Sequence, residues 1–328
     1  MPRTVSIALV ALLWLTTAAP AESPHVIRIE HGSLSATFRD NHESPAVLSG
    51  IDSLFNRDAA PGFDAFDPDS PGASAGMNFE HIISGHENPH NAFSPRHGPF
   101  TMRPLADGPG VQLVRKAADD PWSVDSVLTY RLVAPHYIDV EFRCRPRDAA
   151  KFGRRGYAIF FFCNYMNDVI DPALHFRGIA GPGQPETWIA ADGLPGHPDW
   201  NGGGTYRHVD AAALEYDADL SFKLNSWAYD NPRYTLPFYY GRAARDMVFI
   251  LMFDRTCSAE DEIRFSLFKF KLDRFPRPAW DFEYVIRKVV QDREYGYRTR
   301  LVWKKFVSPD DCLAEYRQWA ASLTTRPE

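Results

Sequence analysis

Residues 128–148 read LTYRLVAPHYIDVEFRCRPRD, and this stretch decides the fold class. From Ile138 to Arg145, apolar and charged residues alternate without interruption. Successive side chains of a β-strand point to opposite faces of a sheet, so this alternation is typical of a strand with one buried face. Ala134-Pro135 separates this strand from another over 124–133 and supplies the turn. The stretch therefore predicts two long antiparallel strands.

The same two-residue period recurs further along the chain. It predicts a strand over 280–286, and in residues 263–272 (IRFSLFKFKL) the apolar phase changes at Phe268, which predicts a β-bulge there. Other runs bounded by turn residues predict further strands. These runs are 25–30, 33–38, 47–56, 157–166, 219–227, 246–254 and 295–306.

One helix is expected, and it is the last element. Ser308 is a suitable N-cap, Pro309 suits the first helical position, and Asp310 and Asp311 suit the positive end of the helix dipole. The resulting fold class is mainly β, a large antiparallel two-sheet β-sandwich with a C-terminal helix. Residues 22–328 are expected to form a single domain, and two segments rich in Gly, Pro and Asp are expected to be long loops. These loops are 56–76 and 178–204.

The N-terminal residues predict export. Arg3 precedes an apolar run from Val5 to Leu15, and Ala19-Pro20-Ala21 matches a cleavage signal, so residues 1–21 resemble a secretory signal peptide. The run is too short to span a bilayer, and later apolar runs have the length of strands, so no membrane span is expected. The formal net charge is −6. Lysine and arginine are spread along the chain, so no nucleic-acid surface is expected.

Four cysteines are present: Cys144, Cys163, Cys257 and Cys312. An exported protein can form disulfides, and Cys144 and Cys163 could lie on neighbouring strands. Both also sit in apolar runs, where a buried free thiol is at least as common. Four cysteines in a chain of this length do not form a disulfide framework, so the pairing stays open.

Three stretches resemble a known superfamily. They are LTYRLVAPHYIDVEFRCRPRD (128–148), PFYYGRAARDMVFILMFDR (237–255) and PAWDFEYVIRKVVQDREYGYRTRLVWKKF (278–306). Their strand texture resembles the galactose mutarotase-like β-supersandwich superfamily, particularly secreted bacterial members of it. The resemblance implies a two-sheet supersandwich that binds sugars on one sheet face, with epimerases, lyases and glycoside hydrolase domains among its relatives. The chain does not carry the asparagine–histidine phrase that surrounds the catalytic histidine of aldose epimerases.

Residues 78–97, NFEHIISGHENPHNAFSPRH, hold four of the eleven histidines. If residues 77–83 form a strand, Glu80 and His81 project to opposite faces and cannot share a site without a bulge. His86, Glu87 and His90 would follow in a loop, because Pro89 argues against a helix. These three residues are the candidate ligands of a divalent metal, with Glu80 as an alternative oxygen donor to Glu87, and no cofactor is otherwise predicted.

A second interpretation of the same stretch is catalytic. His81 or His97 could act as acid or base near neutral pH, with Glu80 beside them and with His208 as a further candidate. Arg96 could hold a uronate carboxylate or a sulfate through two hydrogen bonds. A third interpretation, a solvated polar loop, stays open.

Aromatic residues make up 14% of the chain, and many lie beside polar ones. Sugars present apolar faces ringed by hydroxyl groups, so their sites combine aromatic rings with polar side chains. The candidate substrate-binding residues, besides Arg96, are Asn164, Tyr165, His175, Trp188, Tyr239, Tyr240 and Arg242. Asp281 and Glu283 lie on the polar side of their strand, where solvated acids are the usual outcome.

The sequence therefore predicts an exported protein that acts on or binds an oligo- or polysaccharide. The enzyme hypothesis uses histidine acid–base chemistry and leaves lyase, hydrolase and epimerase reactions open. The alternatives are a non-catalytic glycan-binding or envelope-associated module, and a metal-dependent enzyme built on the loop with His86 and His90.

Overall fold

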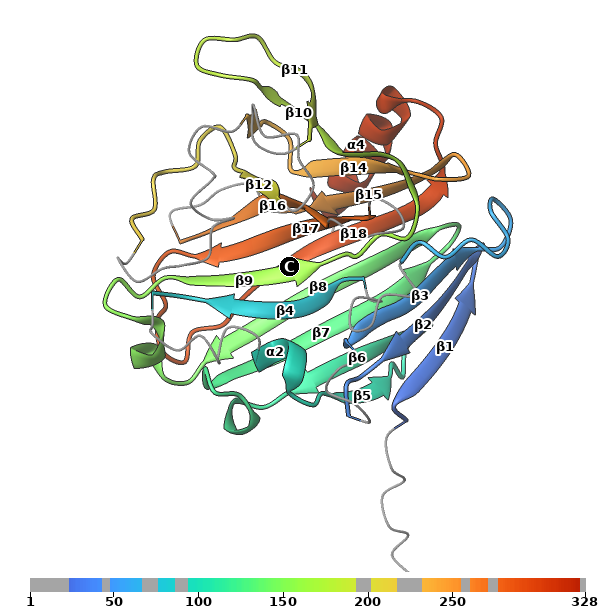
Figure 1. Ribbon diagram of the computed structural model, residues 1–328. Helices are drawn as coiled ribbons and strands as arrows, with labels where there is room; N and C mark the ends of the chain where they lie inside the picture. Colours follow the sequence, from blue (N-terminus) through green and yellow to red (C-terminus); the bar gives the residue numbers. More distant parts are fainter. Residues whose placement is uncertain are drawn as a thin grey trace, which may run out of the picture.

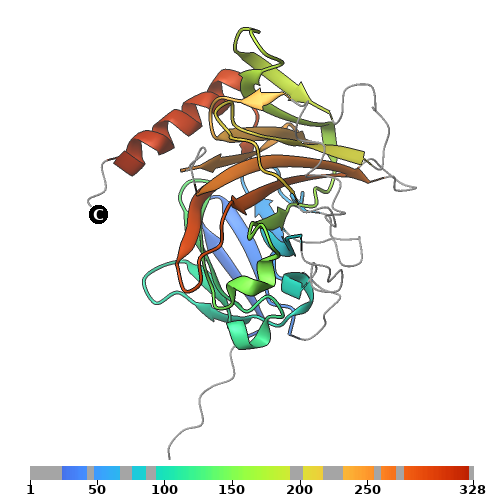
Figure 2. The ribbon, with the colours of Figure 1, turned by 90° about the vertical axis from the view of Figure 1, so that its left-hand side faces the viewer.

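A computed structural model of the 328-residue chain describes residues 24–42, 48–66, 76–85, 94–192, 202–216, 232–254, 260–270 and 277–324. It consists mainly of antiparallel strands in three sheets, which confirms the predicted β-sandwich class. Figures 1 and 2 show the layers: a five-stranded sheet lies against a larger sheet, and one helix lies on the outside of the larger sheet.

The ten-stranded sheet is the larger layer, and the strand pair predicted from residues 128–148 lies inside it as β7 and β8. Nine of its strands form one path, and the short β13 (Arg233–Tyr234) pairs with β10. In spatial order the path is β11 (Thr187–Ala191), β10 (Val169–Ile179), β14 (Phe238–Ala243), β15 (Met247–Phe253), β18 (Tyr295–Lys305), β8 (Tyr137–Pro146), β7 (Val124–Val133), β6 (Gly110–Arg115) and β5 (Thr101–Pro104).

The five-stranded sheet faces this layer across the core. In spatial order it contains β12 (Gly202–Tyr206), β16 (Asp261–Phe270), β17 (Arg277–Ile286), β9 (Ala158–Cys163) and β4 (Asn78–Ile83). A smaller sheet contains β1 (Val26–His31), β2 (Leu34–Arg39) and β3 (Gly50–Asn56). The side chains between the two large sheets are largely aromatic. Phe162, for example, stacks on Phe282 with ring centroids 5.0 Å apart.

The described residues also include three short helical segments and one longer helix. The short ones are α2 (Ser94–His97), η1 (Ala117–Asp119) and η2 (Ala149–Phe152). Helix α4 (Pro309–Thr324) begins as predicted, because the Ser308 hydroxyl accepts a hydrogen bond of 3.1 Å from the Asp311 backbone N–H. Its Cys312 and Trp319 side chains pack on the outer face of the ten-stranded sheet. Within the described residues, no helix is long and apolar enough to cross a membrane.

Several expectations need correction. The bulge predicted at Phe268 is wrong, because β16 and β17 pair in unbroken register from Asp261 to Phe270. The segment 178–204, predicted as a loop, contains β11 and the start of β12. Part of the segment 56–76 is core rather than surface, because Phe66 is fully buried. The strand predicted over 219–227 lies outside the described residues.

The cysteines that the structure describes are free and buried. Cys144 lies on β8 and Cys163 on β9, which belong to different sheets, so they are not cross-strand neighbours. Cys312 lies in helix α4, on the side that faces the ten-stranded sheet. For Cys144 and Cys163 the structure therefore shows buried free thiols, which were one of the two alternatives. Cys257 lies outside the described residues.

Asp64 ties the segment after β3 to that strand, and it makes stability depend on pH. Its carboxylate accepts hydrogen bonds from the backbone N–H groups of Leu54 (2.9 Å) and Phe66 (3.1 Å). Burial raises the pKa of Asp64 from 3.8 to about 7, although those backbone hydrogen bonds lower it. The folded chain therefore holds this proton more tightly than the unfolded chain, so stability should fall as the pH rises from about 4 to about 8.

Asp64→Asn is expected to be as stable as the original chain at pH 4 and more stable at pH 8, by up to about 4 kcal/mol. Asparagine keeps the accepting oxygen and cannot ionise, so the penalty of a buried charge disappears. Urea unfolding at the two pH values measures the difference. Equal free energies of unfolding for the two chains at pH 8 would contradict the assignment.

Candidate functional site

A β-bulge in β4 places Glu80 and His81 on the same face of the five-stranded sheet. The register of β4 against β9 shifts between Phe79, which pairs with Phe162, and His81, which pairs with Phe161. Glu80 is the extra residue of the bulge. Consecutive strand residues normally face opposite ways, and a bulge restarts this alternation by one position. The bulge that the sequence argument required is therefore present, and the two side chains meet.

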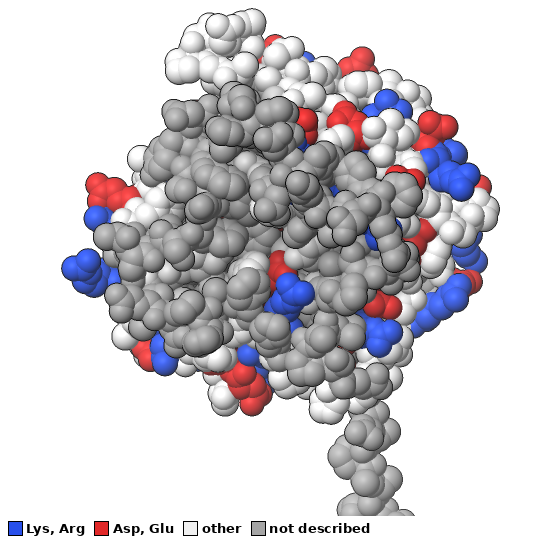
Figure 3. All heavy atoms as spheres, viewed as in Figure 1, with Lys and Arg blue, Asp and Glu red and all other residues white. Residues whose placement is uncertain are grey.

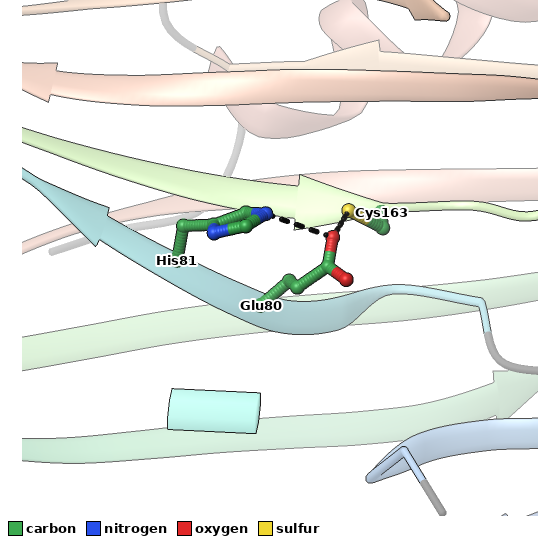
Figure 4. Close-up of side chains that lie close together, drawn as sticks. All are labelled: Glu80, His81 and Cys163. Carbon is green, nitrogen blue, oxygen red and sulfur yellow. Dashed lines mark hydrogen bonds and ion pairs between the residues drawn. The ribbon is translucent and has the colours of Figure 1, made fainter. Parts of the chain in front are cut away.

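The Glu80 carboxylate is buried and accepts hydrogen bonds on both oxygens. Oε1 accepts from Arg96 Nη1 at 2.5 Å and from the Tyr165 hydroxyl at 2.8 Å. Oε2 lies 3.1 Å from His81 Nε2 and accepts from the Cys163 thiol. Figure 4 shows Glu80 and His81 of β4 and Cys163 of β9 converging on this oxygen. Donors from three separate segments thus meet at one carboxylate that is 2% exposed.

The surroundings of Glu80 determine where the protons reside. Burial alone would raise the pKa of Glu80, but His81, Arg96 and the Cys163 thiol outweigh it and lower the pKa to about 2. Burial raises the pKa of the Tyr165 hydroxyl well above its usual value, and it raises the pKa of the Cys163 thiol in the same way. Near neutral pH the cluster therefore consists of an ionised Glu80 surrounded by a protonated phenol and a protonated thiol.

The face that carries Glu80 is polar across several strands. Strand pairing places His81, Phe161, Glu283 and Arg264 in one row, because each is the register partner of the next. Phe161 packs in a small cluster on this face, while its neighbours Phe160 and Phe162 lie in the main core. We call this side of the sheet the polar face, defined by Glu80, His81, Cys163, Asp281, Glu283 and Arg264.

Asp281 and Glu283 differ from the expectation of solvated acids. They are 2% and 0% exposed, because this side of the sheet is covered too. Burial raises the pKa of Asp281 well above its usual range, and nearby Glu80 and Glu283 raise it further. Burial also raises the pKa of Glu283 to about 7, although Arg264 lowers it. The polar face therefore holds carboxyl groups with widely different proton affinities.

The other end of the polar face is an ion network. Glu262 accepts hydrogen bonds from Arg207, Arg264 and Arg287, and all but Arg287 are fully buried. His208 lies next to this network and not at Glu80. Its Nδ1 accepts a hydrogen bond of 3.1 Å from the Asp210 backbone N–H. Burial lowers the pKa of His208.

Two candidate substrate-binding residues lie in the interior. Asn164 accepts a hydrogen bond from the Met77 backbone N–H at 2.8 Å and donates one to the Trp280 carbonyl at 2.9 Å. Tyr239 is fully buried, and its hydroxyl donates to the same Trp280 carbonyl at 2.8 Å. Both side chains connect backbone segments, and this is a structural role.

The other aromatic candidates form a separate group on the outer face of the ten-stranded sheet. His175 stacks on Tyr240 with ring centroids 4.9 Å apart and lies 2.8 Å from an Asp171 oxygen. Trp188 meets Tyr240 edge-on, and Arg242 lies on the same side, over the ring of Phe306. The predicted site residues that the structure describes are thus divided between the interior and two sheet faces, and Glu80, His81, Arg96 and Tyr165 form one group among them.

Two groups of predicted residues cannot be placed as side chains. His97 ends helix α2, and its side chain is not described. The metal candidates His86, Glu87 and His90 lie outside the described residues. Within the described residues, one group of potential metal ligands is found: Glu80, His81 and Cys163, whose donor atoms all lie within 4.8 Å of one another. Cys163 is not among the predicted site residues. On β9 it lies on the same side as Phe161, and Phe160 and Phe162 lie on the opposite side.

The charged side chains on the described surface do not indicate a site that binds a polyanion. On the part of the face in Figure 3 that the structure describes, basic and acidic side chains are interspersed. Across the described residues many charged side chains are paired, such as Arg143 with Glu141 and Arg298 with Asp254. This pattern is typical of an ordinary protein surface.

No family model matches the chain, and no curated protein matches it. Among solved structures it is similar to galactose 1-epimerase from Lactobacillus acidophilus NCFM, at 9% identity over 86% of this chain and 95% of that chain, with a TM-score of 0.47. An aldose epimerase homologue from C. elegans gives 8% identity, coverages of 86% and 99%, and a TM-score of 0.43.

Heparan sulfate lyase from Pedobacter heparinus is also similar, with 7% identity and a TM-score of 0.45. That match covers 89% of this chain and only 38% of the lyase. The three likenesses are remote. Each has a TM-score below 0.5, so they carry no conclusion about the fold or the chemistry of this chain.

Proposed function

We propose that the protein is an exported carbohydrate-active enzyme whose acid–base chemistry takes place at Glu80, His81 and Tyr165. The observation that carries the proposal is the bulge in β4, which joins a carboxylate and an imidazole on the polar face. A carboxylate that orients a histidine beside a protonated phenol is a common arrangement for proton transfer in enzymes. The resemblance of the strand sequences to sugar-acting proteins supports carbohydrate as the substrate class.

The positions of the protons assign the roles. Because the ionised Glu80 carboxylate can only accept, His81 Nε2 carries the proton, and Nδ1 is the basic atom of the ring. His81 Nδ1 would then remove a proton from a substrate hydroxyl or carbon. Tyr165, protonated and bonded to the same carboxylate, would return a proton to a leaving oxygen.

Arg96 supports a preference for charged sugars. Its guanidinium binds Glu80 from the side and is still 23% exposed, so it is the cation at the edge of the cluster. A uronate carboxylate or a sulfate group could pair with this cation. Phe161 lies between His81 and Glu283 in the same row, but it is buried in an apolar cluster and offers no ring face to a sugar.

A non-catalytic glycan-binding module remains the second candidate, because Trp188, Tyr240 and His175 form an aromatic group away from Glu80. The test is a panel of neutral and uronate-containing oligosaccharides incubated with residues 22–328 and analysed by mass spectrometry and chromatography. A product with the mass of hydrolysis indicates a hydrolase, loss of water relative to that mass a lyase, and an unchanged mass with a new retention time an epimerase.

Two variants complete this experiment. Tyr165→Phe should lose turnover if Tyr165 is the proton donor, whereas Trp188→Ala should lose only binding if the aromatic group is the functional part. If no product forms and the Trp188→Ala variant binds glycan more weakly than the original chain, the binding module is favoured.

Mass analysis of the exported chain would show whether residues 1–21 are removed.

A further inference from the structure

Three donor atoms at the bulge have the chemistry of a metal site. Glu80 Oε2, His81 Nε2 and Cys163 Sγ lie within 4.8 Å of one another, and Oε2 and Nε2 are 3.1 Å apart. Zinc bonds of about 2.0–2.3 Å in a tetrahedron place neighbouring ligand atoms about 3.5 Å apart. Small side-chain rotations would therefore bring the three atoms to a single ion. Carboxylate oxygen, imidazole nitrogen and thiolate sulfur together are a donor set typical of zinc.

The surroundings of these atoms also suit a metal ion. The second oxygen of Glu80 is held by Arg96 and Tyr165, so the carboxylate is already oriented with Oε2 towards His81 and Cys163. Hydrogen bonds that orient a ligating carboxylate in this way are typical of metal sites. With Cys163 as thiolate, Glu80 and Cys163 carry two negative charges and Arg96 one positive charge. Their net charge of −1 offsets half of the charge of a divalent cation.

We propose that Glu80, His81 and Cys163 bind a zinc-like divalent cation that switches off acid–base chemistry at His81. In the metal-free cluster, the donors around Oε2 are the imidazole Nε2–H, the thiol S–H and the Tyr165 hydroxyl, which lies 3.0 Å from Oε2. On binding, the S–H bond breaks, a metal–sulfur bond forms and this proton goes to the buffer. A metal–nitrogen bond forms at Nε2, and the proton of Nε2 moves to Nδ1. Nδ1 then has no lone pair to accept a substrate proton. The inhibitory part of the inference rests on the proposed function, whereas the binding part does not.

The test for binding uses Co²⁺ as a spectroscopic substitute for zinc. The chain, purified without a histidine tag and treated with chelator, should take up one Co²⁺ and show the near-ultraviolet band of a thiolate bound to cobalt. Cys163→Ser keeps a hydroxyl donor for Glu80 and removes the thiolate, so the band should disappear. Cys144→Ser removes an equally buried thiol on β8 and should leave the band unchanged. A missing band, or a band that survives in Cys163→Ser, overturns the site.

The test for inhibition uses Zn²⁺ on the glycan that the panel identifies. Zn²⁺ should inhibit the original chain and Cys144→Ser equally, and Cys163→Ser should need at least about 10-fold more Zn²⁺ relative to its own uninhibited rate. Activity that falls on chelation and returns with Zn²⁺ would show that the metal is required, and this overturns the inhibitory role. If no glycan is turned over, the cobalt band still decides whether the site exists, so the two proposals fail separately.

Discussion

Replacing His81 with glutamine is expected to lower kcat/KM for the responsive glycan by about 10²–10⁴-fold. Glutamine carries an N–H group near the position of Nε2, so it can keep the 3.1 Å contact with Glu80. It has no basic nitrogen, so it cannot take the place of Nδ1 in proton transfer. Initial rates across the pH range measure the effect, and the melting temperature shows whether the fold is kept.

His208→Asn is the matched control for this prediction. His208 is about as buried as His81, and asparagine can keep the hydrogen bond that Nδ1 accepts from the Asp210 backbone. Its kcat/KM should stay within about 3-fold of the original value, because no proton transfer is assigned to it. Equal losses in the two variants, or full activity of His81→Gln, would refute the assignment of His81 as the base.

Trp280→Ala is expected to lower the free energy of unfolding by about 3–5 kcal/mol. Trp280 is fully buried on the core side of β17, and its indole N–H donates to the Pro172 carbonyl at 2.9 Å. Its ring fills the space above Gly241, where an added Cβ would lie 2.5 Å from ring atoms. Alanine would leave a large cavity and an unsatisfied carbonyl. Urea or guanidinium unfolding gives the difference directly.

Val307→Ala is the control for the core variant, because Val307 is 70% exposed. Its effect should stay within about 0.5 kcal/mol, as is usual for surface positions. A cost below about 1 kcal/mol for Trp280→Ala would mean that the two large sheets do not pack as described. Since Trp280 and Asp281 are adjacent on β17, the same variant also shows how far the polar face depends on the core beneath it.

The strands that could be predicted are those with one buried face. In β7 and β8 the alternation of buried and partly exposed residues follows the alternation in the sequence. In β16 the same argument predicted a bulge that the structure does not contain. The polar face is also buried, and Phe268 packs there with an apolar cluster. When both faces of a sheet are covered, apolar residues occur in either phase and no longer report the register.

The candidate site could be predicted in composition but not in arrangement. Glu80, His81, Arg96 and Tyr165 were all candidates, and the structure brings them together. Their proximity depends on one shift of backbone register, for which residue types give no signal. Asn164 and Tyr239 are candidates for the same reason, because aromatic and polar residues are neighbours there in the sequence. They nevertheless point to the core, because this pattern does not show which side of a strand is buried.

The bulge in β4 also constrains how this strand can change during evolution. Phe79 and Ile82 both face the main core, so loss of one residue between them would restore strict alternation and leave only one side chain, either Glu80 or His81, on the polar face. Such a deletion would therefore remove either the carboxylate or the imidazole from the site, even where every remaining residue is acceptable. Point substitutions at positions 80 and 81 keep the backbone frame, so descendants of this chain could acquire a different reaction while the length of the strand stays constant.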